Sequence, residues 1–125
     1  MDEDQAIFLK DDQPFRYVSG SIHYYKVPSE YWEDRIRKLR ALGANALQTY
    51  VEWSSHEPEP EEYNFSADND VFRFIRMAAD NDLLVILRPG PFIDSERDFV
   101  SGFCYLPLWI NCSCDSGWFA VLVAA

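Results

Sequence analysis

The chain has 125 residues and a formal net charge of −10, with 48% hydrophobic and 16% aromatic residues. This length predicts one domain or part of one, and the apolar content suffices for a folded core rather than a disordered tail. The charge argues against nucleic acid and anionic membranes as partners, because both repel an acidic protein.

The chain ends give no sign of a targeting or membrane-spanning segment. No basic stretch followed by a long apolar run opens the sequence, so we expect no signal peptide. The apolar run at residues 118–125 is too short to span a bilayer. Cys104, Cys112 and Cys114 are odd in number, which leaves at least one thiol free or paired between chains and does not decide the redox compartment.

A hairpin and a strand are predicted at the start of the chain. Residues 8–15 can form a short hairpin with its turn at residues 11–13. The β-branched and aromatic residues that follow predict a first sheet strand over residues 15–22. Gly20 within this strand indicates the close approach of another backbone.

Two amphipathic helices are predicted between the strands. Pro28 and Ser29 start the first helix and Gly43 ends it. Asp68 or Asn69 can cap the second helix, and Asn81 can end it in a left-handed conformation. Each helix has one apolar stripe at helical spacing, formed by Trp32, Ile36 and Leu39 in the first and by Val71, Phe74, Ile75 and Ala78 in the second.

Two further strands are predicted at residues 46–50 and 83–87. The second of these is apolar at every position, which is typical of a strand buried on both faces of a parallel sheet. Arg88-Pro89-Gly90-Pro91 cannot extend it, so a loop must leave its carboxyl end. In parallel α/β proteins ligands bind at that end.

The order β-α-β-α-β predicts an α/β fold with parallel strands and right-handed connections. Three strands and two helices are too few for a complete (β/α)₈ barrel, which needs roughly 250 residues. Either the chain is the truncated N-terminal portion of a (β/α)₈ TIM barrel over residues 1–110, or its C-terminal part folds irregularly. We expect both helices on one side of the sheet, and residues 111–125 are an unassigned C-terminal tail.

Four motifs give the chain a family resemblance. The pieces SGSIHY, QTYVEW, HEP and LRPGPFI together resemble the N-terminal part of the glycoside hydrolase family 35 β-galactosidases, the lysosomal acid β-galactosidase group. The resemblance runs from about residue 8 to residue 96 and faintly to residue 110. It implies a (β/α)₈ barrel, retaining hydrolysis of terminal β-galactose from glycoconjugates, no cofactor, and a lysosomal or secreted location.

The resemblance also implies a set of substrate-binding residues. The family's galactose-contacting tyrosine corresponds to Tyr50, and its sugar-binding glutamate corresponds to Glu96. In the family pattern isoleucine, cysteine and alanine directly precede this glutamate after the RPGP motif, and this chain has Ile93, Asp94 and Ser95 there. Ile93 therefore matches, while Asp94 and Ser95 depart from the pattern. We expect all five residues to line the sugar site.

No catalytic residue can be assigned. The family's acid/base glutamate follows an asparagine, and no Asn-Glu pair occurs in these 125 residues. Retaining hydrolysis needs two carboxyl groups about 5 Å apart, so we expect this chain to be inactive alone. The alternatives are a non-catalytic truncated isoform or gene fragment with at most a carbohydrate-binding role, and a different (β/α)₈ hydrolase, which the motif cluster disfavours.

Other polar residues have structural interpretations. Glu96 could be a solvated loop carboxylate and Tyr50 a core residue. The spacing of His23, His56 and Glu57 matches no compact zinc pattern, so we expect no metal there, and structural hydrogen bonds for His56 and Glu57.

Arg88 and three glutamates leave further options open. Arg88 at a buried strand end predicts a structural ion pair. Glu52 could pair with Glu57 or Glu96, although nothing in their spacing fixes the separation. The triplets that begin at Asn64 and Asn111 match glycosylation acceptors, which matter only in a secreted chain.

Overall fold

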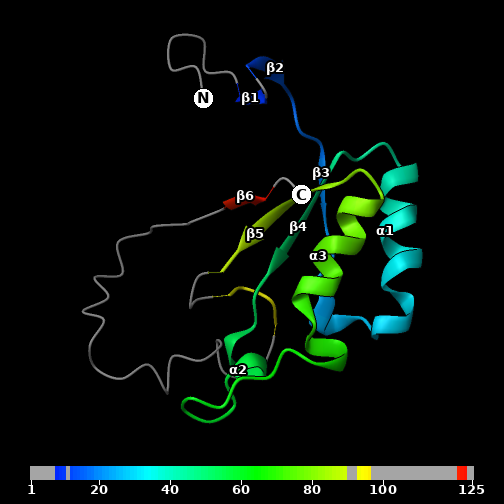
Figure 1. The fold of residues 1–125 in the computed structure, drawn as a ribbon. Helices are drawn as coiled ribbons and strands as arrows, with labels where there is room; N and C mark the ends of the chain where they lie inside the picture. The colour runs from blue at the N-terminus through cyan, green and yellow to red at the C-terminus, as the bar shows by residue number, and fades with distance from the viewer. Residues whose placement is uncertain (1–7, 11, 90–92, 97–120, 124–125) are drawn as a thin grey trace.

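The structure is a computed structural model that describes residues 8–10, 12–89, 93–96 and 121–123. A four-stranded sheet in the order β3-β4-β5-β6 forms its centre, and helices α1 and α3 lie together on one side of it (Figure 1). The hairpin of β1 (Phe8–Lys10) and β2 (Gln13–Phe15) stands apart as a separate two-stranded sheet. The predicted hairpin is thereby confirmed.

The three predicted parallel strands are present. β3 (Ser19–Ser21) pairs in parallel with β4 (Ala46–Tyr50), and β4 pairs in parallel with β5 (Leu84–Arg88). The prediction that β5 begins at Leu83 was wrong by one residue. The Leu83 N–H donates instead to the Ala78 carbonyl at 3.0 Å, so Leu83 closes the preceding helix before the strand begins.

β3 is shorter than the strand predicted over residues 15–22. Phe15 belongs to the hairpin, and the side chain of Asn45 satisfies the backbone that follows. Asn45 Oδ1 accepts from the Val18 N–H at 2.7 Å, and Asn45 Nδ2 donates to the Arg16 carbonyl at 3.0 Å. A side-chain amide therefore takes the place of strand pairing there, which strand propensity alone cannot reveal.

The fourth strand, β6 (Val121–Val123), comes from the tail that the sequence left unassigned. It pairs antiparallel with β5, joining Val121 to Leu87 and Val123 to Val85. In this way β6 covers the edge of β5 that β4 does not occupy (Figure 1). An uncovered edge on so apolar a strand would be open to pairing with other chains.

α1 spans Trp32–Ala41, after a short 3₁₀ turn at Ser29–Tyr31. Gly43 ends it in the left-handed region with φ 93°, as predicted. The close neighbour of Gly20 is a side chain of α1. A Cβ at Gly20 would overlap the Leu39 side chain, so the missing side chain lets α1 pack against β3.

α3 spans Val71–Asp80 and begins later than predicted. Asp70 is its N-cap, accepting from the Arg73 N–H at 2.8 Å, whereas Asp68 accepts from the Ser29 N–H at 2.9 Å. Asn81 is not left-handed. Its side chain donates to the Met77 carbonyl, and Asp82 takes the left-handed conformation with φ 56°. Local hydrogen bonds therefore determine which of the neighbouring Asp and Asn residues begins the helix and which one ends it.

The core lies between the helices and the sheet. Trp32 and Ile36 from α1 meet Phe74 from α3 and Val85 from β5, and each of these side chains is almost completely buried. The predicted apolar stripes thus face the sheet. Burial of each such side chain contributes about 1.5–3 kcal/mol.

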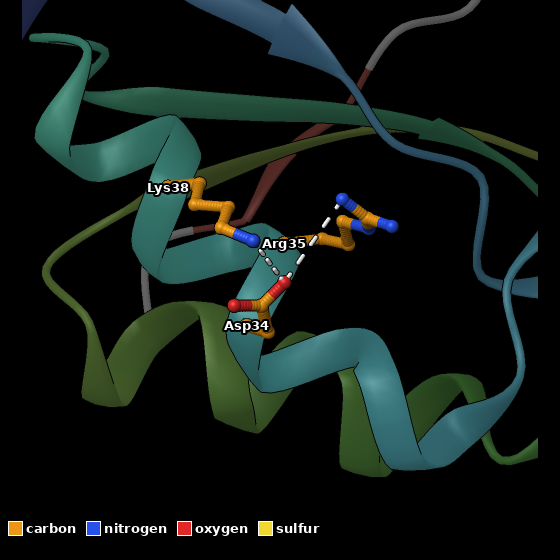
Figure 2. A network of polar contacts seen from close by, with 3 residues as sticks. All are labelled: Asp34, Arg35 and Lys38. Atoms are coloured by element: carbon orange, nitrogen blue, oxygen red, sulfur yellow. Dashed lines mark hydrogen bonds and ion pairs between the residues drawn. The ribbon is translucent and has the colours of Figure 1, made fainter.

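The outer face of α1 is charged and solvated (Figure 2). Lys38 Nζ lies 2.7 Å from Asp34 Oδ2, and Arg35 Nη1 lies 4.0 Å from the same oxygen. The hydrogen bond from Lys38 is the main cause of a lowered pKa at Asp34. Because all three side chains are exposed, these pairs add little to stability.

Candidate functional site

The carboxyl ends of the three parallel strands meet at Tyr50. Tyr50 is the last residue of β4 and pairs in register with Arg88, the last residue of β5. Arg88 Cζ lies 4.3 Å from the centroid of the Tyr50 ring, and the His23 ring, which follows β3, lies 5.4 Å from it. The Tyr50 side chain is only 6% exposed. The Tyr50 ring is therefore held by one residue from each of the two neighbouring strand ends, Arg88 and His23.

His23 is held between two tyrosines. Its ring stacks on Tyr25 at 5.5 Å with an interplanar angle of 14° and contacts Tyr50 on a tilt of 35°. Burial is the main cause of a lowered His23 pKa, and the charges of Lys26 and Arg88 lower it further. Within the described part of the chain, the buried His23 Nδ1 has no hydrogen-bond partner.

The lowered His23 pKa predicts a loss of stability in acid. The folded state resists protonation at His23, whereas in the unfolded state the His23 pKa is near its ordinary value of 6.5. The contribution of neutral His23 to the free energy of unfolding should be complete above pH 6.5. It should diminish as the pH falls from 6.5 toward the lower pKa of His23 in the folded state. Urea unfolding across this pH range, with His23→Asn beside the wild type, measures it. An equal acid dependence in the variant would contradict the prediction.

Residues 93–96 follow β5 and alternate in exposure. Ile93 and Ser95 are buried, whereas Asp94 and Glu96 are exposed. Glu96 has φ 53°, a left-handed conformation that is uncommon for a residue with a side chain. The Ser95 hydroxyl oxygen is buried and has no hydrogen-bond partner among the described residues.

The predicted site residues are only partly brought together. Arg88, the end residue of the strand that leads toward residues 93–96, contacts the Tyr50 ring. Among the described residues no hydrogen bond or ring contact joins Tyr50 to Glu96. The binding roles of Tyr50, Ile93, Asp94, Ser95 and Glu96 therefore stay predictions. The ion pair expected of Arg88 also stays a prediction.

Trp53 connects the loops that leave β4 and β5. It begins the short helix α2 (Trp53–His56), and its Nε1 donates to the Pro89 carbonyl at 2.8 Å. The loop after one strand is thus fixed to the loop after the next, at the carboxyl end of β4, where α2 lies (Figure 1). The prolines of the RPGP motif indicated a loop but gave no sign of this partner.

A buried hydrogen-bond network lies beneath the same loop. His56 Nδ1 lies 2.8 Å from the Asn64 carbonyl oxygen, which can only accept, so Nδ1 carries the proton. His56 Nε2 therefore accepts from the Tyr24 hydroxyl at 2.5 Å. The Tyr24 oxygen in turn accepts from the Glu52 N–H at 3.3 Å. Burial raises the pKa of Tyr24, which keeps its hydroxyl protonated and able to donate.

The structural roles expected for His56 and Glu57 are confirmed. His56 makes the bonds just described, and Glu57 Oε1 accepts from the Glu61 N–H at 3.1 Å. The Tyr24 partner was missed, because a contact between residues 32 positions apart leaves no local pattern. Glu52 is buried, and its Oε2 accepts from the Ser55 hydroxyl.

The described residues hold neither a metal-binding cluster nor a membrane-spanning helix. Within that part of the chain, no group of three His, Cys, Asp or Glu side chains is placed to hold a metal ion. No helix among the same residues is long and apolar enough to cross a membrane.

Comparison with known proteins places the chain among glycosidases. The family model of glycosyl hydrolases family 35 matches residues 7–114. Beta-galactosidases from Mus musculus and Homo sapiens are each 53% identical over 110 residues, which is 88% of this chain. The Bos taurus beta-galactosidase is 56% identical over 103 residues. The chain spans only 15–16% of the length of these relatives.

Solved structures agree on the fold. The exo-beta-1,4-mannosidase Op5Man5 from Opitutaceae bacterium strain TAV5 superposes with a TM-score of 0.60 at 18% identity, over 74% of this chain and 18% of that one. The GH5_18 protein from Bifidobacterium longum gives a TM-score of 0.55 at 16% identity, over 69% and 23%. The expected fold class is confirmed: the chain is an α/β portion of a (β/α)₈ barrel.

Proposed function

Because the chain belongs to family 35 of the glycosyl hydrolases, we propose that it forms part of the galactose-binding site of a β-galactosidase. The bound group is a terminal β-galactose of a glycoconjugate. Tyr50 and residues 93–96 line the site, at the carboxyl ends of β4 and β5. No cofactor is needed, because retaining glycoside hydrolysis uses two carboxyl groups of the protein.

The observation that carries this proposal is the position of Tyr50. It ends β4 beside the ends of β3 and β5, where (β/α)₈ enzymes bind their ligands. Arg88 and His23 hold its ring from two neighbouring strand ends. A ring fixed in advance loses little conformational entropy when a sugar binds, which favours affinity.

Glu96 supports the proposal through its exposure and its backbone. An exposed carboxylate in the segment that follows β5 can accept hydrogen bonds from sugar hydroxyl groups. Its φ of 53° costs conformational energy, and such strain concentrates at binding sites. The alternative of a solvated loop carboxylate predicts no change in sugar binding when Glu96 is replaced.

Hydrolysis is proposed for the family's complete site and not for this polypeptide alone. No residue here corresponds to the acid/base glutamate, so a 125-residue chain should bind galactose without cleaving galactosides. A lysosomal or secreted location is proposed on the same family grounds. The second candidate is a non-catalytic product with a carbohydrate-binding role, which the Tyr50 arrangement would serve equally well.

The test is the equilibrium binding of methyl β-galactoside to the purified chain, measured by saturation-transfer NMR. Glu96→Gln removes a charged acceptor, and we expect affinity to fall about tenfold or more, because such bonds contribute about 1.5–3 kcal/mol. Tyr50→Phe should weaken binding less, since only a neutral hydroxyl is lost. No release of a chromogenic aglycone is expected from any of these proteins.

Matched controls exist on the same chain. Glu61 is also exposed and left-handed, with φ 68°, and Tyr63 is 67% exposed, so Glu61→Gln and Tyr63→Phe should leave binding unchanged. Methyl β-glucoside, which differs only at the C4 hydroxyl, should bind more weakly. Equal losses in the control variants, or no effect of Glu96→Gln, would contradict the proposed site.

A further inference from the structure

The triplet Asn64-Phe65-Ser66 lies in the loop between α2 and α3 and includes none of the residues of the proposed sugar site. It has the Asn-X-Ser pattern that N-glycosylation requires, with no proline in the middle. Asn64 and Ser66 are both exposed. A bulky glycan can therefore be attached here without displacing any buried group.

Hydrogen bonds leave the amide nitrogen of Asn64 available. Asn64 Oδ1 accepts from the Ser66 N–H at 3.0 Å and from the Ser66 hydroxyl at 2.8 Å. Both side-chain bonds use the oxygen, and among the described residues Asn64 Nδ2 donates to none. The serine that defines the triplet thus contacts the amide group that would be modified.

The backbone at Asn64 is held by the buried network. The Asn64 N–H donates to the His56 carbonyl at 2.8 Å, and the Asn64 carbonyl accepts from His56 Nδ1 at 2.8 Å. The Phe65 ring stacks on the His56 ring at 4.5 Å. These contacts hold Asn64 in a fixed position at the surface. Its backbone is not strained there, since Asn64 is not among the positive-φ residues.

The surroundings of the triplet are unusually apolar for an exposed loop. Tyr63 is 67% exposed, Phe65 is 42% exposed, and Phe72 is 62% exposed. Phe65 and Phe72 lie 5.4 Å apart, so their rings form one exposed group. A saccharide attached at Asn64 would start directly beside them.

We propose that Asn64 carries an N-linked glycan when the chain passes through the secretory pathway. Asn64 Nδ2 forms a bond to the anomeric carbon of a lipid-linked oligosaccharide diphosphate. The lipid diphosphate leaves with the bonding electrons, and the amide nitrogen loses one proton to a base of the transferring enzyme. The inference rests on the secretory location included in the proposed function, but not on galactose binding.

The experiment directs the full chain into the endoplasmic reticulum with a cleavable leader. Asn111→Gln removes the other acceptor triplet, and a short C-terminal tag with its own Asn-X-Thr site reports delivery to the lumen. Only molecules that carry the tag glycan are scored. We expect a second glycan on these molecules, removed by peptide N-glycosidase, with Asn64 found as aspartate by peptide mass spectrometry.

Substitutions separate glycosylation from folding. Asn64→Asp keeps an oxygen acceptor for both Ser66 bonds but lacks the amide nitrogen, and it should lose the second glycan completely. Ser66→Ala should lose it as well, and Ser66→Thr should retain it. A tag glycan alone on the Asn111→Gln background overturns the proposal. Galactose binding by unglycosylated bacterial protein is measured separately, so failure of one proposal leaves the other distinguishable.

Discussion

Replacing Trp32 with alanine should lower the free energy of unfolding by about 3–5 kcal/mol, the range for truncating a large core aromatic residue. Trp32 is completely buried and packs edge-on against Phe74 at 5.3 Å. Its Nε1 donates to the carbonyls of Val27 at 2.8 Å and Tyr24 at 3.1 Å. The variant therefore loses the packing of α1 on α3 and the anchoring of the segment after β3.

Urea unfolding followed by far-ultraviolet circular dichroism measures this loss. Trp32→Phe keeps much of the packing but removes the donor, and it should fall between wild type and alanine. Phe72→Ala is the control, because Phe72 is on α3 but 62% exposed. A Trp32→Ala loss no larger than that of Phe72→Ala would show that the core described here does not form.

Tyr24→Phe should lower the free energy of unfolding by about 2–4 kcal/mol, although it removes a single oxygen atom. His56 Nε2 and the Glu52 N–H would both lose their partner in a buried environment. Each unsatisfied buried group costs about 1–3 kcal/mol. The same substitution should loosen α2, and with it the Trp53 contact to Pro89 that connects the two loops.

A double-mutant cycle gives the sharper form of this measurement. Tyr24→Phe combined with His56→Phe should lower the free energy of unfolding by less than the sum of the single changes. The double variant has neither the unpaired His56 Nε2 nor the unpaired Tyr24 hydroxyl that the single variants leave. Tyr31→Phe is the control, since Tyr31 is 57% exposed. Additive losses, or a Tyr24→Phe variant as stable as wild type, would contradict the network.

The spacing of apolar residues predicted the helices and strands well, because the face of an element that is buried must be apolar. The stripes Trp32, Ile36 and Val71, Phe74, Ala78 are buried, and the run of apolar residues up to Leu87 is a sheet strand. Element boundaries were less predictable. Whether Asp68 or Asp70 caps α3 depends on which carboxylate reaches an N–H of its own helix, and Asp68 is occupied by Ser29.

The site was predictable only where motifs carried information. QTYVEW placed Tyr50 at a strand end, and the parallel pairing of β4 with β5 brings Arg88 to its ring. The Tyr24–His56 bond and the Trp53–Pro89 bond span 32 and 36 positions. Neither bond leaves a local pattern in the sequence, because each depends on the conformation that two loops adopt once the strands have paired.

The most direct test of a galactose site at the strand ends is chemical-shift mapping on the isotope-labelled chain with methyl β-galactoside. We predict saturable shifts at the amides of Tyr50, Glu52 and Glu96, with none at Asn45 and Asp82, which lie at the opposite ends of the strands. Shifts confined to the opposite end, or identical shifts with methyl β-glucoside, would contradict a galactose site at the carboxyl ends of β4 and β5.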